Sequence, residues 1–191
     1  GLGDVYKRQL QPLPAGAIVP GEILLVGSDN QINLTSFNWF LSEVVPYLQA
    51  CGCAFDIVVA GTICRSIPAT APVRLLGKLP QLSSAYASAQ VVVNPMQFGT
   101  GLKIKTVEAL GHARALVTTP CGAQGLEEGA QTAFLVAAQA EEFAAHIVRL
   151  LEEPGAAQAL AQAGYHFAEN YNAATEQSLG NLLTANDSAP K

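Results

Sequence analysis

Residues 91–111, VVVNPMQFGTGLKIKTVEALG, decide the fold of this chain. The apolar start of this stretch predicts a buried strand over residues 91–94, and the periodicity after Leu102 predicts a helix. A glycine-rich turn, Gly99-Thr100-Gly101, lies between them. A strand, a glycine turn and a helix N-terminus in this order direct free backbone N–H groups at whatever lies above the loop. The stretch therefore predicts an anion-binding site.

Three charged residues follow the turn within two helical turns: Lys103, Lys105 and Glu108. Lysine side chains suit phosphate, and a carboxylate suits the vicinal hydroxyls of a sugar. Lys105 and Glu108 are three positions apart and share a helix face, whereas Lys103 is closer to the loop. Together these residues predict a sugar-nucleotide site. The competing interpretation is that the charges are ordinary surface residues and that the glycines only make a tight turn.

Strands and helices alternate on both sides of this stretch, which favours a parallel sheet covered by helices on both faces. We therefore expect an α/β fold with a Rossmann-like, doubly wound parallel sheet that binds ligands at the carboxyl ends of its strands. The first helix has Asn33 or Thr35 as its candidate cap. The expected strands are residues 23–28, 55–61, 73–77, 91–94, 115–119 and 134–136, and the expected helices are 33–48, 79–87, one from 102, 140–152 and 155–170.

The composition excludes several classes of protein. Half of the 191 residues are apolar and 13% are charged, which argues against a disordered chain. The net charge is −5 with no long basic run, so we expect no nucleic-acid partner. No apolar run is long enough to span a membrane. The four cysteines lack zinc-site spacing, and we expect small buried thiols.

We expect three parts along the chain. Residues 1–21 are interpreted as non-native sequence followed by a linker from a missing N-terminal domain, because GLGDVYKRQ does not match the apolar pattern that follows. Residues 22–172 form the expected nucleotide-sugar-binding domain. Residues 173–191 are the expected C-terminal tail, with fraying from Ala185 onward.

The order of these pieces resembles the C-terminal, donor-binding domain of a GT-B fold glycosyltransferase, in the retaining family 4 group. The likeness covers residues 22–170. It is carried by ILLVGS, DIVVAG, VRLLGKLPQLSSAYASAQVVVNP and GTGLKIKTVEALGHARALVTTPCGAQGL, in that order. Each piece is weak alone, and their order and spacing are fairly specific. The resemblance implies that this chain is one half of a GT-B fold.

The resemblance assigns residues to the donor. Glu108 matches the second glutamate of the family's E-x7-E motif, which holds the ribose, and Thr100 stands where the first glutamate is expected. The basic pair that many members have after the first strand is absent, so Lys103 and Lys105 are the substitutes. The loop around Leu79 corresponds to the segment that holds the nucleobase. The expected donor site comprises Gly99, Thr100, Gly101, Leu102, Lys103, Lys105, Glu108 and Leu79.

The implied reaction is transfer of a hexose-like sugar from a nucleotide diphosphate to an unknown acceptor, in cell-surface polysaccharide or glycoconjugate synthesis. The sequence has no D-x-D motif, so we expect no metal, and the nucleotide sugar is a substrate rather than a cofactor. The acceptor site and any catalytic group belong to the missing N-terminal domain, and we expect the chain alone to be inactive. We expect a cytoplasmic protein whose missing half carries any peripheral membrane association.

Two other functions fit the same pattern. A degenerate, non-catalytic nucleotide-binding module is favoured by the absence of the first glutamate. A GT-B-fold sugar-nucleotide epimerase would need further carboxylates and histidines, of which this chain has few.

Overall fold

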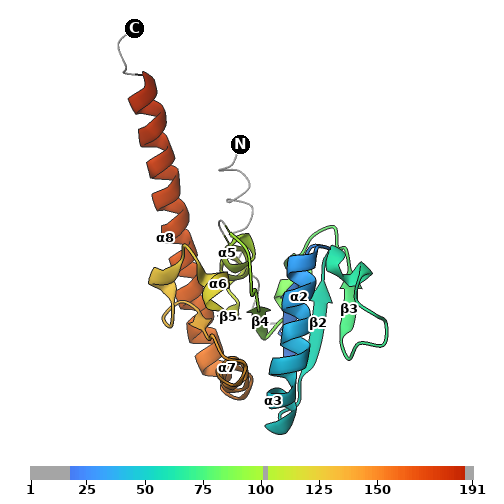
Figure 1. Ribbon diagram of the computed structural model, residues 1–191. Helices are drawn as coiled ribbons and strands as arrows, with labels where there is room; N and C mark the ends of the chain where they lie inside the picture. The colour runs from blue at the N-terminus through green and yellow to red at the C-terminus, as the bar shows by residue number, and fades with distance from the viewer. Residues whose placement is uncertain (1–17, 101–102, 188–191) are drawn as a thin grey trace.

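The computed structural model describes residues 18–100 and 103–187, and these form a parallel α/β sheet covered by helices on both faces (Figure 1). The six strands are arranged in the order β3-β2-β1-β4-β5-β6, and every pairing is parallel. The expected Rossmann-like class is confirmed. The strands are β1 (Glu22–Val26), β2 (Asp56–Ala60), β3 (Arg74–Gly77), β4 (Val91–Asn94), β5 (Ala115–Thr118) and β6 (Leu135–Val136).

Helices and helical turns lie between the strands, and two further helices follow the last strand. Their bounds are α2 (Gln31–Trp39), the π-helical turn η2 (Phe40–Val44), α3 (Val45–Ala50), the 3-10 turn η3 (Thr62–Arg65), α4 (Ser83–Ser88), α5 (Ile104–Gly111), α6 (Pro120–Ala123), the 3-10 turn η4 (Glu127–Gly129), α7 (Ala140–Glu152) and α8 (Pro154–Asp187).

Two apolar layers hold the sheet, because successive side chains of a strand point to opposite faces. In β4, Val91 and Val93 join the layer beneath α2, α3 and α7, which includes Phe40 and Phe143. Val92 joins the other layer, beneath α4, α5 and α8, which includes Tyr86. The continuous apolar run of β4 follows from burial on both faces.

The first helix differs from its prediction in two ways. Asn30 is the N-cap, and its side chain accepts a hydrogen bond from the backbone N–H of Asn33, so the prediction that Asn33 or Thr35 caps the helix is wrong. The helix also widens into the π turn η2 before continuing as α3. Pro46, in the first turn of α3, has no N–H to donate, which accounts for an irregular hydrogen-bond ladder here.

Two other helices have different ends from those expected. Helix α4 begins at Ser83, so Leu79 and Pro80 lie in the loop before it rather than in its first turn. Helix α8 continues to Asp187 instead of ending at Asn170, because residues 171–187 contain no proline to stop it. It therefore passes through the expected domain end at residue 172 and projects beyond the sheet (Figure 1).

One glycine fixes how β1 and β2 end. Gly61 has a φ of 105°, a conformation that favours glycine. A Cβ atom at Gly61 would lie 2.1 Å from the carbonyl oxygen of Gly27. The two strand ends therefore approach backbone to backbone at the edge of the sheet where a ligand is expected.

Candidate functional site

The strand order creates a crevice between the carboxyl ends of β1 and β4. The chain leaves β1 toward α2 on one face of the sheet and leaves β4 toward α5 on the other face. Such a reversal is the usual ligand-binding position in open α/β sheets. The hollow at this position is small, about 10 Å³, and its lining includes Val26, Asn33, Asn94, Pro95 and Lys105. The glycine-rich loop after β4 begins at this crevice.

Lys103 contacts the first glycine of the glycine-rich turn. Its Nζ atom donates a hydrogen bond of 2.9 Å to the carbonyl oxygen of Gly99, and only 3% of the residue is exposed. Gly99 has a φ of 131°, which a glycine adopts without strain. Lys103 therefore reaches back from the start of α5 to the first glycine of the turn. Gly101 and Leu102, also expected in the site, lie outside the described residues.

Lys105 reaches across the crevice to α2. Its Nζ atom donates to Oδ1 of Asn33 at 2.5 Å, and Asn33 in turn donates from Nδ2 to the carbonyl oxygen of Ser28 at 2.8 Å. Burial lowers the pKa of Lys105 to about 8, although the nearby Glu108 carboxylate raises it. Lys105 is therefore a half-buried cation that is mostly protonated at pH 7 and loses its proton as the pH rises through about 8.

Glu108 lies one helical turn beyond Lys105, and a buried tyrosine fixes its carboxylate. The Tyr86 hydroxyl donates to Oε2 of Glu108 at 3.2 Å. Tyr86 is fully buried, and its ring stacks on His112 with the centroids 4.4 Å apart. Burial raises the pKa of Glu108, while the Tyr86 hydrogen bond and Lys105 lower it. One carboxylate oxygen is thus fixed by the protein, and the other accepts no hydrogen bond from a described residue.

A buried hydrogen-bond network fixes α5 relative to the loops after β4 and β5. Nδ2 of Asn94 donates to Oγ1 of Thr106 at 3.1 Å, and Thr106 donates to the carbonyl oxygen of Gly122 at 2.8 Å. Thr118 donates to the carbonyl oxygen of Asn94 at 2.8 Å. The Thr119 hydroxyl donates to the carbonyl oxygen of Met96. Since these polar groups are paired, the network rigidifies the site.

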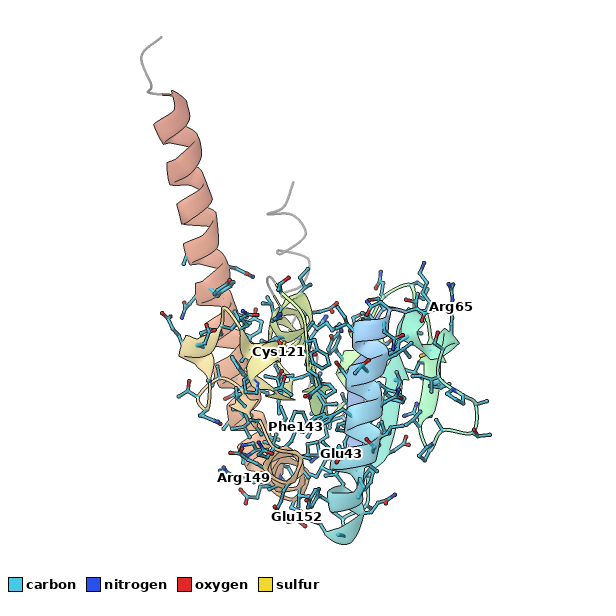
Figure 2. All side chains as sticks on the ribbon, viewed as in Figure 1. Glu43, Arg65, Cys121, Phe143, Arg149 and Glu152 are labelled. Atoms are coloured by element: carbon cyan, nitrogen blue, oxygen red, sulfur yellow. The ribbon has the colours of Figure 1, made fainter. Side chains whose placement is uncertain are left out.

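The structure brings most of the expected site residues together. Gly99, Lys103, Lys105 and Glu108 gather at the start of α5, and Thr100 is exposed in the loop. Leu79 lies apart, in the loop after β3, where it packs against the apolar layer that contains Tyr86. Figure 2 labels Cys121, whose thiol lies 3.7 Å from the carbonyl oxygen of Gly99 and so marks this end of the sheet.

Sequence reasoning missed three residues of the site: Asn33, Tyr86 and Thr106. The sequence predicts only a capping role for Asn33. Tyr86 and Thr106 belong to no motif that indicates a binding site. The one available signal was position, because Asn33 follows the first strand and its glycine turn, where α/β proteins bind ligands.

The described residues, 18–100 and 103–187, contain neither a candidate metal site nor a candidate membrane-spanning helix. They contain no group of three or more His, Cys, Asp or Glu side chains arranged to hold a metal ion. None of their helices is both long and apolar enough to cross a membrane.

Comparison with known proteins gives a family match. The model of the family described as glycosyl transferases group 1 matches residues 20–153, which include every candidate site residue. No curated protein sequence matches the chain.

Solved structures share the fold at low sequence identity. TarM superposes with a TM-score of 0.73 at 15% identity, over 92% of this chain and 36% of TarM. The pneumococcal O-GlcNAc transferase GtfA, in complex with UDP and GlcNAc, gives 0.62 at 17% identity, over 90% and 38%. The C-terminal domain of the group 1 protein LpcC from Francisella tularensis gives 0.58 at 14% identity, over 89% and 92%. The chain thus spans little more than a third of TarM and GtfA.

Proposed function

This chain belongs to the glycosyl transferases group 1 family, and from that premise we propose that it is the donor-binding half of a glycosyltransferase. The donor is a nucleotide diphosphate sugar, which is a substrate and not a resident cofactor. The observation that carries the proposal is the pairing of a half-buried Lys105 with a half-buried Glu108 on one face of α5, beside a glycine turn. A cation can bind the diphosphate, and a carboxylate can accept hydrogen bonds from the ribose hydroxyls of a nucleoside diphosphate.

The diphosphate lies over the start of α5 in this proposal. Lys105 offers a positive charge from within the crevice, and the helix N-terminus adds its dipole and free N–H groups. As the glycosidic bond breaks, negative charge grows on the leaving diphosphate, and these fixed groups stabilise it. Lys103 has a different role, since its ammonium group already donates to the carbonyl oxygen of Gly99 and thereby fixes that residue. No protein-held metal takes part.

The nucleoside lies toward α4. The oxygen of Glu108 that Tyr86 does not hold accepts hydrogen bonds from the ribose hydroxyls, and charge-assisted bonds of this kind are strong. The nucleobase lies near the loop that carries Leu79. Thr100, which replaces the first glutamate of the motif, faces the sugar.

The acceptor side belongs to a partner domain upstream. Three apolar side chains, Ile32, Phe98 and Ile104, are exposed around the start of α2 and the glycine-rich loop. An apolar rim of this kind suits a covering domain. Without it, the chain binds the donor and transfers no sugar. We place the whole enzyme in the cytoplasm, with cell-surface polysaccharide or glycoconjugate synthesis as its pathway. Peripheral membrane association, in this proposal, belongs to the partner domain.

Calorimetric titration tests the donor site. Wild-type protein should bind UDP, GDP or ADP more tightly than the matching nucleoside. Glu108→Ala should weaken diphosphate binding by about 1.5–3 kcal/mol, the scale of a hydrogen bond to a charged group. Glu142→Ala, a matched carboxylate on α7, should bind as the wild type does. Equal affinity of the wild type and Glu108→Ala would remove Glu108 from the site.

One observation favours a second function, a non-catalytic nucleotide-binding module: Thr100 stands where the motif has a glutamate. Joining the chain to a cognate upstream domain separates the two. Sugar transfer by the joined protein supports the enzyme, and nucleotide binding without transfer or donor hydrolysis supports the module.

A further inference from the structure

A second cavity, of about 840 Å³, lies at the opposite edge of the sheet from the donor site. Gly21, Gln90 and Arg114 line it, and each directly precedes a strand, so the cavity opens at the amino ends of β1, β4 and β5. Its other wall is the end of α7 and the start of α8. Glu152, labelled in Figure 2, marks this end of the molecule, opposite Cys121.

Arg114 is the unusual residue of the cavity. Only 4% of it is exposed, and its Nε atom is buried without a hydrogen-bond partner. Among the described residues, no hydrogen bond or ion pair to its guanidinium group is found. The neighbouring amide of Gln90 cannot serve, because it already donates to the carbonyl oxygens of Leu150 and Leu151 and accepts from the N–H of Gly21.

A guanidinium group buried without an anion is costly, and an anion that enters the cavity removes this cost. Burial lowers the pKa of Arg114, in keeping with an unpaired cation. The N-terminus of α8, a helix of 34 residues, lies in the same wall, and its dipole also favours negative charge. Two independent features of the cavity therefore favour an anion.

The other residues that line the cavity indicate the polarity and size of the ligand. Ile18, Pro20, Leu151, Pro154 and Ala157 make most of the surface apolar. The cavity volume lies within the range of small-molecule sites, about 300–1,000 Å³. Glu152, an exposed carboxylate on the same wall, disfavours a dianion such as a phosphate. The fitting ligand has one negative charge and an apolar body.

We propose that this cavity is a second ligand site, which binds an amphipathic monocarboxylate with its carboxylate on the Arg114 guanidinium. The planar guanidinium group can donate two parallel hydrogen bonds to a carboxylate. The apolar body lies along the α7–α8 wall. The site shares no residue with the donor site, so it stands or fails independently of the proposed function.

Calorimetric titration of the full chain with decanoate and with decanol tests the site. Decanoate should bind the wild type, and Arg114→Met should weaken decanoate binding about tenfold or more while it changes decanol binding less than about twofold. Arg65→Met removes an exposed arginine near the other edge of the sheet and should bind both as the wild type does. No decanoate binding by the wild type, or equal binding by Arg114→Met, overturns the proposal.

A second variant tests the cavity without changing Arg114. Ala161→Phe keeps the arginine and fills part of the cavity, so it should weaken the binding of decanoate and decanol alike. Unchanged decanoate binding by Ala161→Phe would place the ligand elsewhere and overturn the proposal. Concentration-dependent self-association that Arg114→Met abolishes would assign the cavity to a second copy of the chain and would also overturn it. Nucleotide titration of the same variants should match the wild type.

Discussion

The cations at the carboxyl and amino edges of the sheet differ in their burial and in their hydrogen-bond partners. At the carboxyl edge, Lys105 is hydrogen-bonded to Asn33 and lies near the Glu108 carboxylate. At the amino edge, Arg114 is almost fully buried, and no described residue accepts a hydrogen bond from its Nε atom. The carboxyl edge is filled by a polar network, whereas the amino edge surrounds a wide, mostly apolar cavity.

A cation whose partner lies within the fold is already hydrogen-bonded, whereas a cation whose partner comes from solution is left without an acceptor. Lys105 is held by Asn33 without any ligand, so the proposed donor would meet a site whose geometry is already set. Arg114 lacks this organisation, and in the proposed ligand site its partner comes from outside the described residues. Four changes test the difference between the two edges.

The largest effect is expected from Gly122→Ala at the carboxyl edge. A Cβ atom at Gly122 would lie 2.0 Å from Oγ1 of Thr118 and 3.1 Å from Nδ2 of Asn94, within the buried network. We expect a loss of about 3 kcal/mol in the free energy of unfolding. Gly155→Ala at the amino edge meets no atom within 4 Å and should change it by no more than about 1 kcal/mol, toward greater stability. Urea denaturation of both variants measures the difference, and equal losses would contradict a rigid carboxyl edge.

The next effect is a pH dependence of nucleotide binding. The pKa of Lys105 is lowered to about 8, so the protonated fraction falls to roughly one in ten at pH 9. If only the protonated form binds the diphosphate, the dissociation constant for UDP should rise about tenfold between pH 7 and pH 9. Calorimetry across this range measures it.

Lys105→Met supplies the control for this titration. It should bind UDP more weakly at pH 7 and show no such rise toward pH 9. An equal rise in the variant would assign the pH dependence to another group.

A smaller effect is expected from Tyr86→Phe. This change removes the hydrogen bond to Glu108 and should lower the free energy of unfolding by about 1 kcal/mol at pH 7. The same bond lowers the pKa of Glu108, so that pKa should rise further in the variant. NMR titration of the Glu108 carboxyl carbon measures the shift. Tyr47→Phe, at an exposed tyrosine, should change neither quantity.

The smallest effect is expected from Arg114→Met without added ligand. Because the guanidinium group has no anion to lose, the free energy of unfolding should change by no more than about 0.5 kcal/mol or should rise. Arg74→Met is the contrast, since Arg74 donates to the buried carboxylate of Glu22 at 2.5 Å and the change should cost about 1 kcal/mol. A loss for Arg114→Met as large as that for Arg74→Met would reveal a partner for Arg114.

The sequence predicted the fold well, because strands buried on both faces are continuous apolar runs bounded by glycine. The run at Val91–Val93 and the glycine turn after it located the crevice, and the family resemblance is confirmed. Helix ends were less predictable. Helix α8 runs past Asn170 because its sequence offers no strong stop, and α4 begins after Pro80 although proline suits a first turn.

The candidate site was predicted only where its residues are close in sequence. Lys105 and Glu108 share a helix face by spacing alone, and the nucleotide that they are expected to bind stays a prediction. Their partners Asn33 and Tyr86 lie 72 and 22 residues away, and only the folded chain brings them into contact. Arg114 gave no signal, because a lone arginine after a helix is ordinarily exposed and only tertiary packing buries it.

The close approach of Gly61 to Gly27 has a consequence for how this sequence can diverge. Position 61 is closed to every other amino acid on two grounds, its φ of 105° and the Gly27 carbonyl oxygen in the place of a Cβ atom. Position 27 is less restricted, because a Cβ atom there would meet only the Ile63 side chain at 3.1 Å. In a saturation library selected for folded protein, codons for glycine alone should survive at 61, and alanine should persist at 27 as a minor variant.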